Sequence, residues 1–447
     1  MSLANGSQGS HFLAAGVSKR EAWSWAMFDF ANSGYTTVVI TAIFNAYFVG
    51  VVTNNQDWGT FAWTASLAVS YVLIMIAAPL VGAYADAYGA KKRLLLLSTV
   101  GCVSFTALLY FVGPGDFWLA ILLIVLSNFF FGCGENLIAA FLPELAQSRA
   151  LGKVSGWGWS LGYIGGLISL GASLAYVTWA QDKGMQADQF VPVTMLITAG
   201  IFAVVCIPTF VFLKERAVPQ PHLFGRHAGR EALARLMGTL RQVREFRDLL
   251  RFLASLVFYQ AGIQTVITLA AIYAQQVMHF DTSDTMFLVL VVNVTASVGA
   301  LAFGSFQDKM GHIPTIALTL CGWILMVLLA WSAESRSMFW VAANVAGLCL
   351  GASQSAGRAL VGYFSPSARR AEFFGIWGLA GKLSSILGPI TYGTVSWISS
   401  GDHRLAMLLT GVYFVIGLVI LIGIDIKRGR NAALESDLAP VRAGEFG

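Results

Sequence analysis

The chain has 447 residues, of which 57% are hydrophobic, 13% aromatic and only 11% charged, with a formal net charge of +5. Soluble globular proteins carry about 25% charged residues, so this composition excludes an ordinary soluble enzyme, and it is too apolar for a disordered chain. The class that remains is a polytopic helical membrane protein.

Long apolar runs follow one another along the whole chain. A helix needs about 20 mainly apolar residues to cross about 30 Å of hydrocarbon, and these runs are too long for barrel strands. The sequence therefore predicts an all-α polytopic fold with twelve transmembrane helices. In chain order the predicted spans are 24–50, 59–85, 93–113, 117–141, 154–179, 190–213, 251–277, 285–307, 313–332, 337–362, 372–398 and 403–425.

The basic residues divide unevenly between the segments that connect these spans. An even number of spans places both termini on one side, and 23 of the 28 Lys and Arg residues fall on that side. Lys183, Arg336 and Arg404 fall on the opposite side. By the positive-inside rule we expect both termini to be cytoplasmic. The same distribution explains the positive charge without any binding of nucleic acid.

The spans and the charges divide the chain into five segments. The linker is either a plain connection or contains a short amphipathic helix over 231–248. The polar start of the chain lacks a targeting peptide and the loops are compact, which favours a bacterial cell (inner) membrane. The segments are a cytoplasmic tail over 1–23, a six-helix half over 24–213, a cytoplasmic linker over 214–250, a second half over 251–425 and a cytoplasmic tail over 426–447.

An internal repeat relates the two halves. The motif G-x-x-x-D-x-x-G follows the second span, and it returns 222 residues later after the eighth span. Other matches, such as Glu135 with Arg358, keep an offset of 223 residues. Two pseudo-symmetric six-helix halves around a central site are the architecture of alternating access. The motif residues are Gly82, Asp86 and Gly89 in the first copy and Gly304, Asp308 and Gly311 in the second.

The paired motif in a twelve-span chain resembles the major facilitator superfamily. Within it the chain is similar to the vacuole-effluxer-like branch, which includes autophagy-related amino-acid effluxers. Ala87 and Ala90 depart from the superfamily's usual basic positions, whereas Lys91 and Lys92 keep the later ones. The resemblance implies a transporter rather than an enzyme. It is carried by residues 25–35, 259–267, 354–358, 371–375 and 381–385.

The resemblance also implies a gate at the cytoplasmic side. Asp86 is expected to face the start of the eleventh span, near Glu372, and by symmetry Asp308 should face the start of the fifth span, near Lys153. A carboxylate at a helix N-terminus contributes about 1 kcal/mol, which suits a contact that must open again. Alternatively, these segments are solvated turns with an ordinary Gly and Asp.

Polar residues recur at helical spacing in the first, fourth, seventh and tenth spans. A helix that faces only lipid would not carry such a stripe. The stripes either line a path for a solute or bind the helices to one another; the resemblance implies that these four spans line the cavity. The residues that we expect to contact substrate are Asn32, Tyr35, Thr36, Gln260, Gln264, Gln354, Arg358 and Lys382.

Four charged residues fall inside the spans. Asp29 and Glu135 belong to the first half, and Arg358 and Lys382 to the second. A charge in the bilayer costs about 2.5–3.5 kcal/mol, so each should have a partner or a function. The bases suit an anionic group of a substrate, and the acids suit an ammonium group or a coupling proton. Alternatively they form structural ion pairs, in particular Glu135 with Arg358, which are equivalent in the repeat.

We therefore predict a secondary active transporter of a small polar solute that is amino-acid-like, zwitterionic or anionic. It would work by rocker-switch alternating access, with a coupling proton, without cofactor or metal, and as a monomer. The five cysteines lie singly in apolar runs, and the sequence contains no compact catalytic cluster. The alternatives are efflux of lipophilic compounds or drugs, a channel and a membrane-embedded enzyme.

Overall fold

The computed structural model describes most of the chain as long helices. A bridge between Leu13 and Ala146 joins the N-terminal segment to the first half. The predicted linker helix over 231–248 lies largely outside the described residues. The described residues are 12–54, 56, 58–217, 246–280, 282–399 and 402–445.

Among the described residues, twelve long helical segments lie where the sequence predicts the twelve spans. Eleven of them are long and apolar enough to cross a membrane. The other is α13, whose polar stripe lowers its mean hydropathy although its length is sufficient. The segments are α1 (Lys19–Tyr35) with its continuation to Val52, α3 (Gly59–Tyr88), α4 (Lys91–Leu108), α5 (Phe117–Ala139), α7 (Leu151–Asp182), α8 (Ala187–Phe212), α10 (Arg247–Gln276), α11 (Thr282–Met310), α12 (His312–Ser332), α13 (Arg336–Phe364), α14 (Arg370–Ile398) and α15 (His403–Ile422).

Short elements extend or connect these helices. The first span continues beyond α1 as a π-helical stretch, a short helix and a second π-helical stretch. Two 3₁₀ turns stand directly before α7 and α14. The named elements are η1 (Thr36–Ala42), α2 (Ile43–Tyr47), η2 (Phe48–Val52), η3 (Leu109–Phe111), α6 (Leu142–Leu145), η4 (Ser148–Ala150), η7 (Ser367–Arg369) and α16 (Ile426–Glu445).

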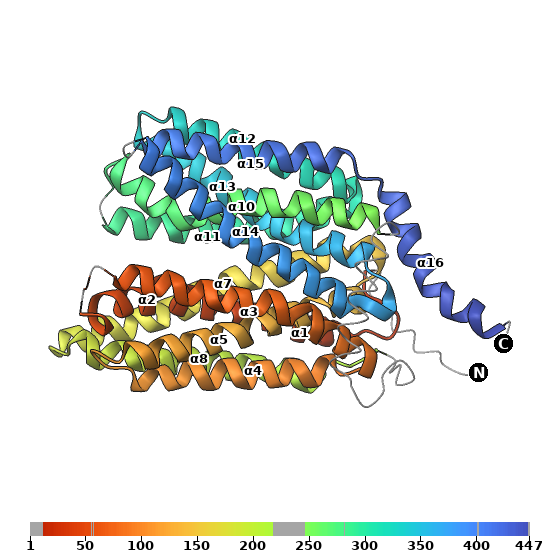
Figure 1. Cartoon of the computed structure of the whole chain (residues 1–447), viewed down its shortest axis with the longest axis horizontal. Helices are drawn as coiled ribbons and strands as arrows, with labels where there is room; N and C mark the ends of the chain where they lie inside the picture. Colours follow the sequence, from red (N-terminus) through yellow and green to blue (C-terminus); the bar gives the residue numbers. More distant parts are fainter. Residues whose placement is uncertain are drawn as a thin grey trace, which may run out of the picture.

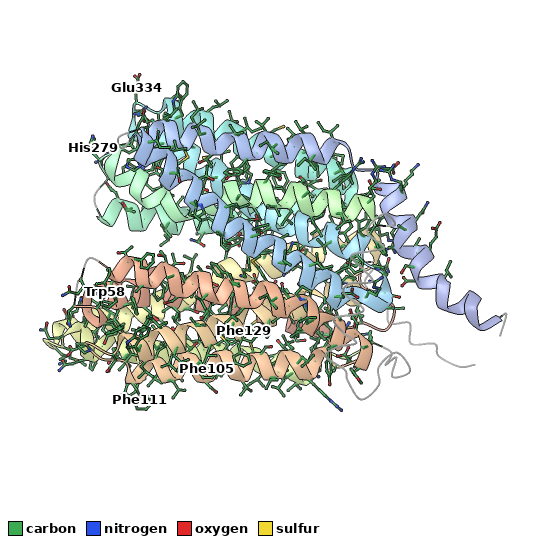
Figure 2. All side chains as sticks on the ribbon, in the orientation of Figure 1. Trp58, Phe105, Phe111, Phe129, His279 and Glu334 are labelled. Carbon is green, nitrogen blue, oxygen red and sulfur yellow. The ribbon has the colours of Figure 1, made fainter. Side chains whose placement is uncertain are left out.

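The helices form two bundles that lie side by side, with α1 to α8 in one and α10 to α15 in the other (Figure 1). Across the interface α7 packs against α11, and α3 packs against α14. The start of α1 and helix α16 lie at the same end of the bundles, which we call the terminal face (Figure 1). The other end is the opposite face, where Figure 2 places Trp58 of one half and His279 of the other.

Large apolar side chains cover the outside of both bundles. Phe61, Trp118 and Ile422 are each more than 70% exposed. Figure 2 shows Phe111 at the outer edge of the first bundle, and this side chain is 67% exposed. Such a surface is unfavourable in water but is expected where helices face lipid. The outer surface therefore agrees with a multi-pass membrane protein.

The C-terminal segment contains a helix that the sequence did not predict. Residues 426–447 are predicted as a cytoplasmic tail, and the structure forms helix α16 over most of them. The apolar residues of α16 are spaced on one face rather than continuous, so a search for long apolar runs does not find it. At the other end, α1 begins at Lys19, five residues before the predicted first span.

Candidate functional site

The first copy of the repeated motif joins the halves at the terminal face. The backbone N–H of Glu372, in the first turn of α14, donates to Asp86 Oδ2 over 2.9 Å. Gly82 lies one turn earlier on α3, where a Cβ would collide with the backbone carbonyl of Ala371. Gly89 ends α3 with a φ of +58°, a conformation that favours glycine. The motif thus places a buried carboxylate on the N-terminus of a helix from the other half.

The second copy repeats this arrangement with the halves exchanged. The backbone N–H groups of Gly152 and Lys153, at the start of α7, donate to the two carboxylate oxygens of Asp308, each over 3.0 Å. A Cβ on Gly304 would lie 2.6 Å from the carbonyl oxygen of Gly152. Gly311 has a φ of +94° between α11 and α12. The structure therefore brings both predicted gate carboxylates to the helix starts that we expected.

Lys91, which follows the first motif, is buried in a charged cluster. Its ammonium group pairs with Glu144, and Arg370 of the other half lies 3.8 Å from the same carboxylate. Glu215 lies 4.0 Å from Lys91 and accepts a hydrogen bond from the backbone N–H of Lys92. Burial raises the pKa of the Glu215 carboxyl. Charged side chains from both halves therefore meet beside the first copy of the motif.

An ion pair between Asp29 and Arg358 crosses the interface deeper in the molecule. Arg358 Nη1 lies 2.7 Å from Asp29 Oδ2, and only 3% of the Arg358 side chain is exposed. Its Nε donates to the Ser155 hydroxyl over 3.1 Å, and its Nη2 donates to the Ser155 carbonyl over 2.8 Å. The rings of Trp25 and Trp159 lie 4.8 Å and 5.3 Å from the guanidinium carbon. Every nitrogen of the guanidinium group therefore has a partner.

A second ion pair between the halves is more open. Lys382 Nζ lies 3.3 Å from Glu135 Oε2, and the two side chains are 16% and 31% exposed. The ammonium group also lies 5.4 Å from the ring of Tyr71 and 5.8 Å from that of Phe131. This pair is therefore more accessible than the buried Asp29–Arg358 pair.

These contacts correct one alternative of the sequence analysis. Glu135 does not pair with Arg358, because Glu135 bonds to Lys382 and Arg358 bonds to Asp29. Tyr71 and Ser155 are not among the residues that the sequence predicts for the site. A tyrosine or a serine on a spanning helix is usually a packing residue, so nothing in the sequence distinguished these two.

The predicted amide residues lie near these ion pairs. Gln260 Nε2 donates to Gln354 Oε1 over 3.0 Å, which joins α10 to α13. Asn32, Gln260 and Gln354 are each 8–9% exposed. Gln264 is half-buried and Thr36 is exposed, one turn beyond Gln260 and Asn32 respectively. Both stripes therefore run from a buried amide to a more exposed polar residue toward the opposite face.

Tyr35 lies elsewhere than predicted. Its side chain is 1% exposed, its hydroxyl group lies 2.5 Å from the Ser127 hydroxyl, and its ring stacks on Phe131 at 4.8 Å. In this conformation Tyr35 belongs to the core of the first half rather than to a surface that a solute can reach. An aromatic residue beside a polar stripe satisfies the same spacing in either environment, so the pattern did not separate them.

In the described residues, twelve long helices form two halves that are joined at one face by two copies of the G-x-x-x-D-x-x-G motif, which is the architecture of membrane transporters of the major facilitator class. Within that class the chain belongs to the family described as "Vacuole effluxer Atg22 like", whose model matches residues 45–434.

Known relatives agree with this assignment. The chain is 26% identical to the uncharacterized MFS-type transporter YxiO of Bacillus subtilis, with 89% of this chain and 93% of that protein covered. It is 24% identical to autophagy-related protein 22-1 of Aspergillus fumigatus, with 71% and 56% covered. It is 20% identical to autophagy-related protein 22 of Candida glabrata, with 86% and 80% covered.

Solved structures share the fold. The human organic anion transporter MFSD10 superposes with a TM-score of 0.71 at 14% identity, covering 90% of this chain and 99% of that chain. The proton:xylose symporter XylE superposes with a TM-score of 0.65 at 16% identity, covering 89% and 94%. At these identities the likeness shows the two-half, twelve-helix fold alone.

Proposed function

We propose that the chain is a secondary active transporter of a small polar solute that carries an anionic group. The observation that carries this proposal is the Glu135–Lys382 pair, in which a base and an acid from different halves meet and both stay partly exposed. A compact ammonium group can leave a carboxylate of the protein for a carboxylate of the solute without losing its charge compensation. Glu135, released by this exchange, then pairs with an ammonium group of the solute or takes up a proton.

The position of the contacts between the halves supports transport by alternating access. Both gate carboxylates lie near the terminal face and each is held by the start of a helix from the other half. The Asp29–Arg358 pair and the hydrogen bond between Ser155 and the Ser355 carbonyl add to the same interface. We infer a conformation closed at the terminal face, and transport by rocking of the halves as these contacts break and form again.

The direction of this closure depends on the orientation in the membrane. The excess of basic residues at the terminal face supports termini on the cytoplasmic side of a bacterial cell membrane. Fusions of a phosphatase, which is active only outside the cytoplasm, test this. A fusion after Glu445 should be inactive and one within the loop at Lys183 should be active. The reverse pattern would overturn the orientation.

Thermal stabilisation by ligands tests the proposed cargo. A ligand that binds only the folded state raises its stability, by about 2.7 kcal/mol at a hundred times its Kd. The detergent-purified protein would be screened with amino acids, dipeptides, organic anions, sugars and lipophilic cations. We expect hits among amino acids or organic anions that are lost in Lys382→Ala and kept in the control Lys183→Ala, which changes an exposed residue. Hits only among lipophilic compounds, unaffected by Lys382→Ala, would support drug efflux instead.

A further inference from the structure

Asn32 and Gln260 occupy equivalent places in the two halves. The sequence Asn-Ser-Gly at 32–34 corresponds to Gln-Ala-Gly at 260–262, 228 residues later. Both side chains are more than nine-tenths buried. The side-chain carbonyl oxygen of each has no hydrogen-bond donor among the described residues. Buried acceptors are normally paired, so two unpaired ones at equivalent positions indicate a ligand that donates hydrogen bonds.

Asn32, Gln354 and Gln260 lie at a similar depth along the helices, directly beyond the buried Asp29–Arg358 pair. Asn32 is one turn from Asp29 on α1, and Gln354 is one turn from Arg358 on α13, both toward the opposite face. A helix rises 1.5 Å per residue, so these amides lie roughly 4.5 Å and 6 Å beyond the 2.7 Å contact between Asp29 and Arg358. Gln260 joins the same level through its hydrogen bond to Gln354.

Lys382 lies near this level as well. Its ammonium group is 5.8 Å from the Phe131 ring, which stacks at 4.8 Å on Tyr35. Tyr35 lies one turn beyond Asn32 on α1. The Glu135–Lys382 pair is thus connected through two ring contacts to the turn of α1 that follows Asn32. We infer that this pair borders the same part of the interface as the two unpaired amide oxygens.

We propose that Asn32 and Gln260 bind the ammonium group of a zwitterionic solute, one oxygen from each half, while Lys382 holds its anionic group. An ammonium group donates up to three hydrogen bonds and accepts none, which matches two acceptors that lack donors. This inference rests on the proposed function and narrows the cargo from an anion to a zwitterion. It also leaves Glu135 available for a proton.

Matched ligand pairs test this assignment. Binding to the purified protein would be compared for alanine and propionate, leucine and 4-methylpentanoate, and glutamate and glutarate. The wild-type protein should bind the amino acid at least about tenfold more tightly than the acid without the amino group. In Asn32→Leu/Gln260→Met, which removes both acceptors at similar volume, this preference should disappear while the affinity for the acid stays within about twofold. Asn431→Leu, which replaces an exposed amide side chain on α16, is the control and should keep the preference.

The outcomes separate the two proposals. Equal binding of acid and amino acid by the wild-type protein, dependent on Lys382, overturns the ammonium site and keeps the anion site. Binding of neither class overturns the proposed cargo itself. If the double variant does not fold, the single variants Asn32→Ala and Gln260→Ala should each reduce the preference. An unchanged preference in both would overturn the assignment.

A different observation concerns helix α16, which crosses the terminal face (Figure 1). Arg430 Nη2 donates to the Ser148 hydroxyl over 3.2 Å, and Ser148 belongs to η4, the turn before α7. Asp437 Oδ1 accepts hydrogen bonds from both the backbone N–H and the hydroxyl of Ser367, each over 2.7 Å, and Ser367 belongs to η7, the turn before α14. Helix α16 therefore contacts the turns before α7 and α14, the helices whose first turns bind Asp308 and Asp86.

The geometry points to α16 as a latch for the conformation closed at the terminal face. The first turns of α7 and α14 are the segments whose N–H groups hold Asp308 and Asp86. The start of α16 is anchored to the second half, where Arg428 Nε lies 2.6 Å from Asp248. A helix anchored in one half that also bonds to the other resists their separation.

Spin-label distances test the latch. In a background with the five native cysteines replaced, one label pair would join Arg93 and Lys309 near the terminal face, and another would join Thr60 and Ser337 near the opposite face. Removal of 426–447, or Arg430→Ala/Asp437→Ala, should raise the ratio of molecules open at the terminal face about five- to tenfold. Glu435→Ala, an exposed change on the same helix, should leave both distance distributions unchanged. Unchanged distributions in Arg430→Ala/Asp437→Ala would overturn the latch.

Discussion

The two bases buried between the halves differ in how completely their side chains are engaged. Arg358 donates through all three guanidinium nitrogen atoms, and two tryptophan rings lie 4.8 Å and 5.3 Å from its guanidinium carbon. Lys382 has one carboxylate partner, and both members of that pair reach solvent. A fully engaged guanidinium group stabilises one arrangement of the halves, whereas a partly engaged ammonium group can bind something else. This difference supports the proposal that Arg358 stabilises the closed arrangement and that Lys382 binds the solute.

Removal of each base should affect stability differently. Arg358→Ala leaves the buried carboxylate of Asp29 without its partner, and breaking such a pair costs about 3–5 kcal/mol. Lys382→Ala should cost less, because the released Glu135 is 31% exposed and water can solvate it. Thermal unfolding of the purified variants checks this, with Asp29→Asn/Arg358→Gln expected to recover part of the loss. An Arg358→Ala protein that unfolds at the wild-type temperature would contradict the structural role.

At the scale of elements, the conformation that we propose as closed at the terminal face requires a close approach of α3 to α14. A Cβ on Gly82 would collide with the backbone carbonyl of Ala371, and a backbone atom cannot move aside as a flexible side chain can. Gly82→Ala should therefore weaken the closed conformation and favour the one open at the terminal face. The label pair between Arg93 and Lys309 measures this as a larger share of long distances.

The matched control for this change is another glycine of a spanning helix. Gly171 on α7 has no atom within 4 Å of the position that a Cβ would take, so Gly171→Ala should leave the distances unchanged. Equal responses of the two variants would mean that alanine acts through helix propensity and not through the contact of α3 with α14.

The helices could be predicted because their physical cause is local, whereas the partners of the charges could not. An apolar run of about 20 residues marks a span by itself. The contact of Asp86 with the start of α14 was expected only from the resemblance to the major facilitator superfamily, and the structure contains it. The repeat equates Glu135 with Arg358. Two equivalent residues lie at the same depth in different halves, but their rotation about the symmetry axis decides whether they touch. The sequence does not show that rotation. Helix α16 could not be predicted as a span because it contains no long apolar run.

At the scale of the whole molecule, the two copies of the motif make equivalent contacts, and under the proposed alternating access both act on one equilibrium between conformations. Each contact joins a carboxylate of one half to the first turn of a helix in the other, so both should break together when the halves move as rigid bodies. Contacts that form in only one conformation shift the populations by their full free energy, and two weak ones keep the equilibrium reversible. A single strong contact with the combined free energy of the two weak ones would hold the halves together on only one side of the interface.

Neutralising the gate carboxylates should therefore give additive shifts. Asp86→Asn and Asp308→Asn each remove a charge from a helix N-terminus, worth about 1 kcal/mol, or about a fivefold change in the ratio of the conformations. The gates share no hydrogen-bond partner in the contacts described above, so the double variant should change the ratio about 30-fold. Spin-label distances at both faces measure the ratio in all four proteins, with ligand affinity as a check that the central site is intact. A double variant no more open than either single one would mean that one gate alone determines closure, and the repeat would then be symmetric in sequence but not in mechanism.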